Sequence, residues 1–220
     1  MAVDLIIFDC DGVLVDSEPL AMRTLIAAIG DQGIEITPEY AYRNYLGRSV
    51  ESISTSLFDT HGEPLELAAI QAMRTRLYDL YRTDLHASPG LPQILQTLPA
   101  PFCVASSSSL ERIRLSLELT GLLPNFTDHI FSASMVENGK PAPDLFLHAA
   151  HAMGVQSARC LVIEDSPAGI KAARAAGMTV FAYLGGSHAI PGGLAAQTQE
   201  LNPDAIFHDM HALPNLLGSR

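Results

Sequence analysis

The chain has few basic residues, few cysteines and no long apolar run. Of its 220 residues, 13 are lysine or arginine and 24 are aspartate or glutamate, which gives a net charge of −11. This balance argues against nucleic acid or an anionic membrane surface as a partner, although an acidic protein can still bind a phosphate group locally. No run of about eighteen apolar residues suggests a membrane span, and the N-terminus lacks the features of a signal peptide.

The three cysteines, Cys10, Cys103 and Cys160, each lie in or beside an apolar, strand-like run. An odd number of cysteines in that setting indicates reduced thiols in the core, and therefore predicts a cytoplasmic protein. The apolar fraction of 48% and the charged fraction of 17% describe an ordinary globular protein with a sizeable core.

The order of apolar runs and helical patterns predicts an α/β fold. Helical spacing separates most of the runs, as in Leu110–Leu119, 143–153 and the segment that begins at Ser166-Pro167 and ends at Gly177. Strands that alternate with helices indicate a Rossmann-like, doubly wound parallel sheet covered on both faces. The predicted strands are 5–7, 102–105, 129–131, 160–163, Thr179–Tyr183 and 205–207.

Between the first two strands the pattern is helical for some seventy residues. Segments 19–29, 38–46, 49–61 and 64–82 have helical spacing, with glycine and proline between them. We therefore expect an all-helical insertion at residues 16–86 and a core made of residues 1–15 and 87–220.

Two aspartates, Asp9 and Asp11, follow the first strand directly. Side chains two apart on an extended chain point to the same side, which turns Cys10 the other way. Two like charges held this close need a cation or a proton to offset their repulsion, and oxygen ligands suit Mg²⁺. Gly12 then allows a sharp exit from the strand.

A second acidic pair, Glu164-Asp165, follows the strand at 160–163. Acidic residues before a helix are commonly capping groups, but Ser166 already has the preferred N-cap chemistry. One of the two carboxylates is therefore expected to be free to bind the metal.

Two further polar groups could bind an anion. Ser106 offers a hydroxyl, and the backbone N–H of Ser107 can reach an anion at a turn from strand to helix. Lys140 lies in a loop stiffened by prolines. The alternatives are a plain serine-rich turn with Ser109 as the N-cap, and a solvated lysine.

Together these motifs resemble the haloacid dehalogenase-like hydrolase superfamily, in the group with a small helical cap that includes β-phosphoglucomutase-like proteins and sugar-phosphate phosphatases such as 6-phosphogluconate phosphatase. The four matching stretches, in chain order, are 9–18, 104–107, 139–144 and 163–169. The resemblance implies a Rossmann-like core with the helical insertion as a cap over the strand ends.

The resemblance also implies roles for individual residues. Asp9 would be the nucleophile that forms an aspartyl-phosphate, and Asp11 would be the general acid and base. Mg²⁺ would be held by Asp9, the backbone carbonyl of Asp11 and Asp165, with Glu164 acting through water. Ser106 and Lys140 would neutralise the phosphoryl oxygens.

The expected substrate is a small phosphomonoester, namely a sugar or sugar-acid phosphate, and the expected state is a monomer. Cap residues would contact the leaving group, and the candidates are Arg48, Ser49, Arg74 and Arg76. A dehalogenase is disfavoured because it would not need Asp11 or the second acidic pair.

A phosphomutase is the main alternative, because it shares every core motif. Mutases of this type carry a hinge histidine where this chain has Ala21, and they tend to have a cap arginine where it has Val50. Both departures favour hydrolysis. A non-catalytic phosphometabolite-binding protein is the remaining alternative.

Overall fold

The computed structural model describes residues 3–218. Its centre is a sheet of six parallel strands in the order β3-β2-β1-β4-β5-β6. The α/β fold predicted from the alternating pattern is confirmed. The strands are β1 (Leu5–Phe8), β2 (Phe102–Ser106), β3 (Ile130–Ser132), β4 (Cys160–Glu164), β5 (Thr179–Tyr183) and β6 (Ala205–Phe207).

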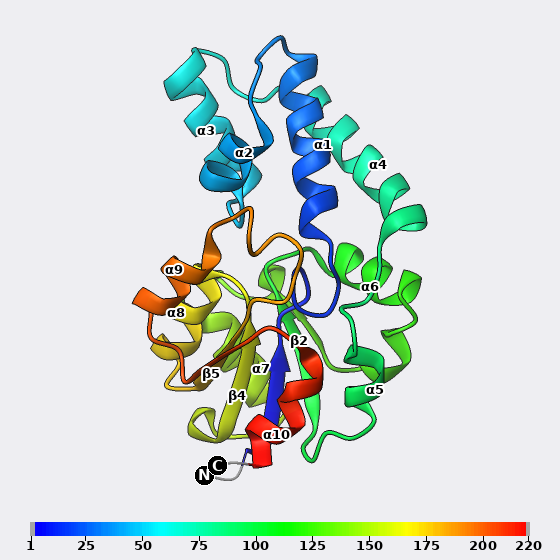
Figure 1. The fold of residues 1–220 in the computed structure, drawn as a ribbon, viewed down its shortest axis with the longest axis vertical. Coiled ribbons are helices and arrows are strands. Elements are labelled where there is room, and N and C mark those ends of the chain that lie inside the picture. Colours follow the sequence, from blue (N-terminus) through cyan, green and yellow to red (C-terminus); the bar gives the residue numbers. More distant parts are fainter. Residues whose placement is uncertain (1–2, 219–220) are drawn as a thin grey trace.

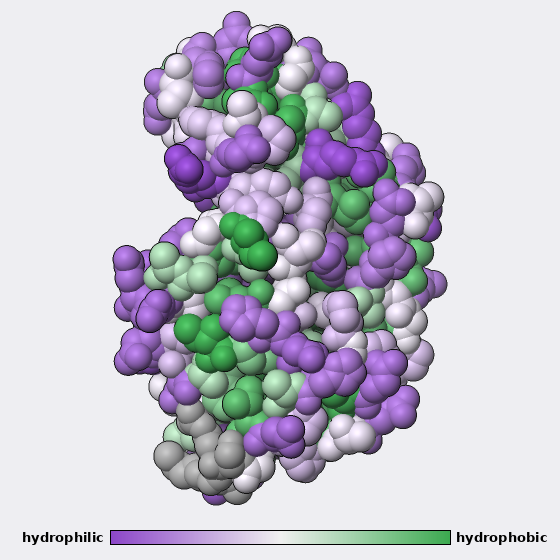
Figure 2. Space-filling model, viewed as in Figure 1, coloured by the Kyte–Doolittle hydropathy of each residue, from purple (hydrophilic) through white to green (hydrophobic). Residues whose placement is uncertain are grey.

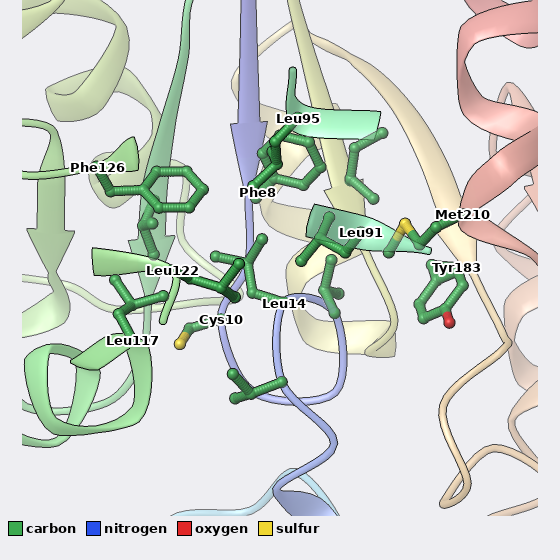
Figure 3. Close-up of a cluster of buried hydrophobic side chains, with 14 of the residues drawn as sticks. Phe8, Cys10, Leu14, Leu91, Leu95, Leu117, Leu122, Phe126, Tyr183 and Met210 are labelled. Atoms are coloured by element: carbon green, nitrogen blue, oxygen red, sulfur yellow. The ribbon is translucent and has the colours of Figure 1, made fainter. Parts of the chain in front are cut away.

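The central strand β1 is buried on both sides, which explains its unbroken apolar sequence. Its side chains alternate between two apolar clusters, as the pleat requires. Ile6 and Phe8 belong to one cluster, and Leu5 and Ile7 belong to the other. Figure 3 shows the first cluster, where Phe8 lies among leucine side chains from the neighbouring helices.

Helices cover both faces of the sheet. α5 (Leu91–Leu95), α6 (Leu110–Leu119) and α10 (Leu213–Gly218) contribute to the cluster around Phe8. The other face is covered by α7 (Asp144–Ala152) and α8 (Pro167–Ala175), and α9 (Leu194–Glu200) lies against α8. Short 3-10 helices in the described residues span Leu123–Asn125, Ala133–Met135, Ser157–Arg159 and Met210–Ala212.

Of the five helices between β1 and β2, the first four form the helical insertion that the sequence predicts: α1 (Glu18–Asp31), α2 (Pro38–Tyr45), α3 (Val50–His61) and α4 (Leu67–Asp84). Thr37 and Ser49 begin α2 and α3 by accepting hydrogen bonds from backbone N–H groups of the first turn. The insertion has its own apolar cluster, which includes Met22, Tyr45 and Leu57. In Figure 1 it stands beyond the end to which the dark blue strand β1 points.

The lower ends of the two long helices of the insertion pack on the core. Leu20 of α1, and Leu77 and Tyr81 of α4, belong to the apolar cluster around Phe8. The insertion therefore rests on the core through α1 and α4, while α2 and α3 hold to it through their own cluster. The division at residues 16 and 86 stays a prediction.

Some element boundaries differ from those expected. The last helix of the insertion begins at Leu67 rather than at Pro64, because the backbone N–H of Leu65 is bonded to the Ser54 hydroxyl at 3.0 Å outside any helix. The short helices α5 and α9 were not predicted; each has too few residues to show a helical period.

All three cysteines carry free, buried thiols, in agreement with the sequence interpretation. Within residues 3–218 we find no helix that combines the length and the apolar character needed to cross a membrane.

Candidate active site

The polar residues that follow the strands meet at the carboxyl edge of the sheet. β2, β1 and β4 are neighbours, so Ser106, Asp9 and Glu164, which end or follow these strands, lie at the same edge. They line a cavity of about 680 Å³ that residues of both the core and the insertion enclose. In Figure 2 the outline of the molecule is notched where the insertion meets the core.

Lys140 joins two of the predicted acidic residues. Its Nζ lies 2.6 Å from Oδ1 of Asp9 and 2.6 Å from Oε1 of Glu164, and its side chain is 3% exposed. The ammonium also lies 4.8 Å from the ring centre of Phe146. Burial opposes the charged form, but the two carboxylates raise the pKa of Lys140. Lys140 is therefore a buried cation at the site and not a solvated loop residue.

Three buried carboxylates gather around this ammonium. Asp9, Glu164 and Asp165 each offer one oxygen, and these oxygens lie within 4.8 Å of one another. Burial raises the pKa of Asp9 well above its usual value, and the charges of Glu164 and Asp165 add to this although Lys140 opposes it. One ammonium does not offset three carboxylates, so the cluster fits a further cation bound by hard oxygen ligands.

Both carboxylate oxygens of Glu164 accept hydrogen bonds. Besides the bond to Lys140, its Oε2 accepts hydrogen bonds from the backbone N and the Oγ of Ser166, at 2.8 and 2.9 Å. A Cβ on Gly169 would lie 1.7 Å from Oε1, so only glycine leaves room for this carboxylate. Ser166 also caps α8, as predicted, by accepting a bond from the N–H of Gly169. Asp165 is the carboxylate of the pair that is bound neither to Lys140 nor to Ser166.

Asp165 has a partner that the sequence analysis did not find. Nε2 of His188 lies 2.7 Å from Oδ2 of Asp165, and both side chains are buried. Gly12, at a φ of +83°, lies beside this pair, and a Cβ there would be 2.3 Å from Oδ2 of Asp165. Gly12 thus permits the predicted sharp turn, and it also permits the two acidic stretches to approach each other closely.

Asp11 faces a different set of groups from Asp9. Its carboxylate accepts hydrogen bonds from Ser17 and Ser108 at 2.6 Å each, and it pairs with Arg112 at 2.8 Å. Burial alone would raise the pKa of Asp11, but the Arg112 charge and the two hydroxyls lower it. The arrangement favours the ionised form of Asp11.

The serine run after β2 forms the expected turn from strand to helix. Oγ of Ser106 accepts a hydrogen bond from the backbone N of Ser108 at 3.1 Å, and Ser109 caps α6. Ser106 and Ser107 both line the cavity. Ser109 is therefore the expected N-cap of α6, and Ser106 in the same turn lies at the site.

The structure brings three of the four cap candidates to the cavity. Arg48, Ser49 and Arg74 line it, whereas Arg76 does not and instead pairs with Asp31 within the insertion at 2.6 Å. The groups that reach the cavity are themselves engaged in local bonds. Arg48 donates to the Ser52 hydroxyl at 2.7 Å, Ser49 caps α3, and Arg74 pairs with Glu111 of α6.

The sequence matches the model of a known family. The family model described as haloacid dehalogenase-like hydrolase matches residues 3–177. The chain belongs to this family. Among characterised relatives, 6-phosphogluconate phosphatase from Escherichia coli (strain K12) is 32% identical over 190 residues, which are 86% of this chain and 86% of that protein.

Solved structures of family members have the same fold as this hydrolase. A haloacid dehalogenase-like protein from Agrobacterium tumefaciens has a TM-score of 0.90 at 34% identity, with 99% of both chains covered. A family hydrolase from Deinococcus radiodurans R1, solved with bound phosphate and sodium, has a TM-score of 0.80 at 28% identity, covering 98% of this chain and 96% of that one. The resemblance predicted from the four motifs is confirmed.

Besides His188, sequence reasoning assigned no role to four residues of the hydrolase's site: Ser17, Glu18, Ser108 and Arg112. Ser17 and Glu18 end the matching stretch 9–18, and the other two also had a local signal. Ser108 lies in the same serine run as Ser106, and Arg112 lies in the first turn of the helix that Ser109 caps. Position in a strand-end turn therefore identified the region, while the choice among neighbouring residues required the three-dimensional packing.

Glu18 is the first residue of α1 and lines the cavity of the hydrolase. Burial raises its pKa to about 7; the charge of Asp11 adds to this, Arg112 opposes it, and Asp165 adds to it again. Within residues 3–218 its carboxyl makes no hydrogen bond or ion pair. Glu18 is therefore an unpaired acidic group that faces the site from the base of the insertion.

Proposed function

We propose that this hydrolase is a Mg²⁺-dependent phosphatase that hydrolyses small phosphomonoesters, namely sugar or sugar-acid phosphates, through an aspartyl-phosphate on Asp9. The observation that carries the proposal is the contact of Lys140 with Asp9 and Glu164 beside Asp165. The name of the Escherichia coli relative and the phosphate in the Deinococcus structure support the same class of substrate.

Asp9, Asp165 and the backbone carbonyl of Asp11 would hold Mg²⁺, with Glu164 acting through water. The oxygen donor set fits this ion, because Asp9, Glu164 and Asp165 are buried together with more negative charge than Lys140 offsets. When bound, the ion neutralises charge on the phosphoryl group and lets a dianion approach a carboxylate.

Asp9 is suited to be the nucleophile. One of its oxygens is fixed by Lys140, which orients the carboxylate at the end of β1. In the first step an Asp9 oxygen forms a bond to phosphorus while the ester P–O bond breaks. The leaving alkoxide takes a proton from Asp11, and the product alcohol leaves.

In the second step a water molecule attacks the phosphorus of the aspartyl-phosphate. Asp11 takes a proton from this water, the bond from phosphorus to the Asp9 oxygen breaks, and inorganic phosphate leaves. The contacts of Asp11 with Ser17, Ser108 and Arg112 favour its ionised form, which is the form that this step needs. The first step needs the protonated form, so we expect Asp11 to leave Arg112 when substrate binds.

Lys140, Ser106 and the backbone N–H of Ser107 would bind the phosphoryl oxygens. Lys140 is a cation inside the cavity, and the two serines lie at the turn before α6. Phosphoryl transfer depends mainly on such positioning and charge compensation.

Residues 16–86 would act as a cap that excludes bulk water and contacts the leaving group. Arg48, Ser49 and Arg74 are the cap groups at the cavity. The core and the insertion each bury their own apolar side chains. We therefore propose that the protein is a monomer.

The test is a panel of sugar, sugar-acid and nucleotide monophosphates with phosphate release as the readout, with Mg²⁺ and with excess chelator. Phosphorus NMR on glucose 1-phosphate, with and without a bisphosphate activator, separates hydrolysis from mutase activity. We expect inorganic phosphate and no appreciable glucose 6-phosphate, since Ala21 stands where a mutase has its hinge histidine. Isomerised sugar phosphate that forms faster than free phosphate would establish the mutase, and no turnover of any ester would contradict the phosphatase and favour a phosphometabolite-binding protein.

A further inference from the structure

We infer that His188 is a positioning residue for Asp165, holding that carboxylate in the orientation in which it binds a divalent cation. The inference rests on the proposed metal site and adds to it a residue from a different part of the chain. His188 lies in the loop between β5 and α9, and its Nε2 is 2.7 Å from Oδ2 of Asp165.

The position of His188 is fixed by its surroundings. The residue is fully buried, at 0% exposure. Its ring lies against Gly12, where a Cβ would approach Cε1 to 2.8 Å. The preceding residue, Ser187, donates from its backbone N and its Oγ to Asp16, at 3.2 and 2.7 Å. The loop is thus tied to the stretch that follows the nucleophile, and the imidazole has little freedom to move away from Asp165.

The chemistry of the pair defines what His188 contributes. A carboxylate that binds a cation is ionised and only accepts hydrogen bonds, so Nε2 of His188 must carry the proton between them. Nδ1 is buried and has no partner among the described residues. The hydrogen bond then restricts rotation of the Asp165 carboxylate.

Hydrogen bonds to the carboxylate ligands of a metal contribute to its affinity, and their removal typically weakens binding about 10- to 100-fold. Asp165 depends more on His188 than Glu164 depends on either of its partners. Glu164 is bonded to both Lys140 and Ser166, whereas among the described residues the Asp165 side chain is hydrogen-bonded to His188 alone.

The experiment measures Mn²⁺ binding to the metal-free protein without substrate, from the electron paramagnetic resonance signal of free Mn²⁺. We expect His188→Leu to weaken binding about 10- to 100-fold, and His188→Gln, which keeps an N–H donor of similar reach, to stay within about threefold of the parent. The matched control is His211→Leu, which removes an exposed histidine that is bonded to Asp209 at 2.8 Å, outside the residues that line the cavity. Thermal unfolding without metal establishes that each variant is folded.

Folded His188→Leu with the parent's Mn²⁺ affinity would overturn the inference, as would a His188→Gln variant as weak as His188→Leu. A parent protein that binds no Mn²⁺ would overturn the proposed metal site itself. Normal Mn²⁺ binding without phosphate release from any ester would overturn the proposed function, while the ratio of affinities would still decide the role of His188.

Discussion

The strand ends of the core and the helical insertion place their charges in opposite ways. At the strand ends, Lys140 and Asp9 are buried, with side chains 3% and 9% exposed, and they are bonded to each other. On the insertion, Arg74 and Arg76 keep 59% and 48% of their side chains exposed and pair with carboxylates at the surface. A buried charge is costly unless its partners are in place, whereas an exposed pair contributes little.

The difference indicates which region has a fixed arrangement. A chain does not bury three carboxylates and an ammonium for stability, because apolar residues would fill the same space at least as well. The proposed function therefore explains the cluster at the strand ends better than stability does. Substitutions there are expected to have large effects on activity or on its dependence on metal, whereas those on the insertion are expected to have small ones.

The largest expected effect is that of Asp9→Asn. An amide is a poor nucleophile, so turnover should fall below detection while the fold is kept, as measured by phosphate release and thermal unfolding. The matched control is Asp4→Asn at the opposite end of β1, where the exposed Asp4 pairs with Arg159. Activity of Asp9→Asn within tenfold of the parent would contradict the assignment.

The second prediction separates phosphate binding from metal binding. Lys140→Ala should lower kcat/KM about 100-fold or more, since it removes a preorganised charge beside the phosphoryl group. Asp165→Ala should instead raise the Mg²⁺ concentration needed for activity, which a titration of Mg²⁺ against rate measures for both variants. Lys171, an exposed lysine on α8, provides the control Lys171→Ala.

Excess Mg²⁺ is expected to restore activity to Asp165→Ala and not to Lys140→Ala. The reverse pattern would exchange the roles assigned to the two residues.

The positions of the core residues were predictable from the sequence for a simple physical reason. Parallel strands end at one edge of the sheet, so residues that directly follow different strands meet there whatever the details of the packing. Asp9, Ser106 and Glu164 needed only that rule. Lys140 was also found, but only as one residue of a motif, since a lysine in a loop has no strand to direct it.

His188 and Arg112 were not predictable in the same way. His188 contacts Asp165 across 23 residues and Arg112 contacts Asp11 across 101, and no period or spacing connects these pairs. The insertion presented a different difficulty. Arg74 and Arg76 lie two residues apart on α4 and therefore face different directions, so packing alone decided that Arg74 reaches the cavity.

Glu18 lies where the two regions meet, and its titration gives a third, smaller prediction. Its pKa is about 7 in the folded protein, above the usual value of about 4.3. The folded state therefore binds the proton more tightly, and stability falls as pH rises from about 4.3 to 7. Glu18→Gln should stabilise the protein by about 1–2 kcal/mol at pH 8, less than the full shift would give because the side chain is half-buried, and by nothing at pH 4.

Urea unfolding of parent and Glu18→Gln at both pH values checks this prediction, with Glu51→Gln as the control at an exposed carboxyl that lines the same cavity. An equal difference between parent and Glu18→Gln at pH 4 and pH 8 would show that the carboxyl titrates normally.

The smallest expected effects are on the insertion, where Arg74→Ala and Arg76→Ala form a matched pair on one helix. Each removes an exposed ion pair, so each should change the free energy of unfolding by less than about 1 kcal/mol. Arg74 lines the cavity and pairs with Glu111 of the core, whereas Arg76 pairs with Asp31 inside the insertion. We therefore expect kcat/KM to fall about threefold to tenfold for Arg74→Ala on its best substrate and to stay unchanged for Arg76→Ala. Equal losses in the two variants would mean that α4 acts through the stability of the insertion and not through a contact of Arg74 with the substrate.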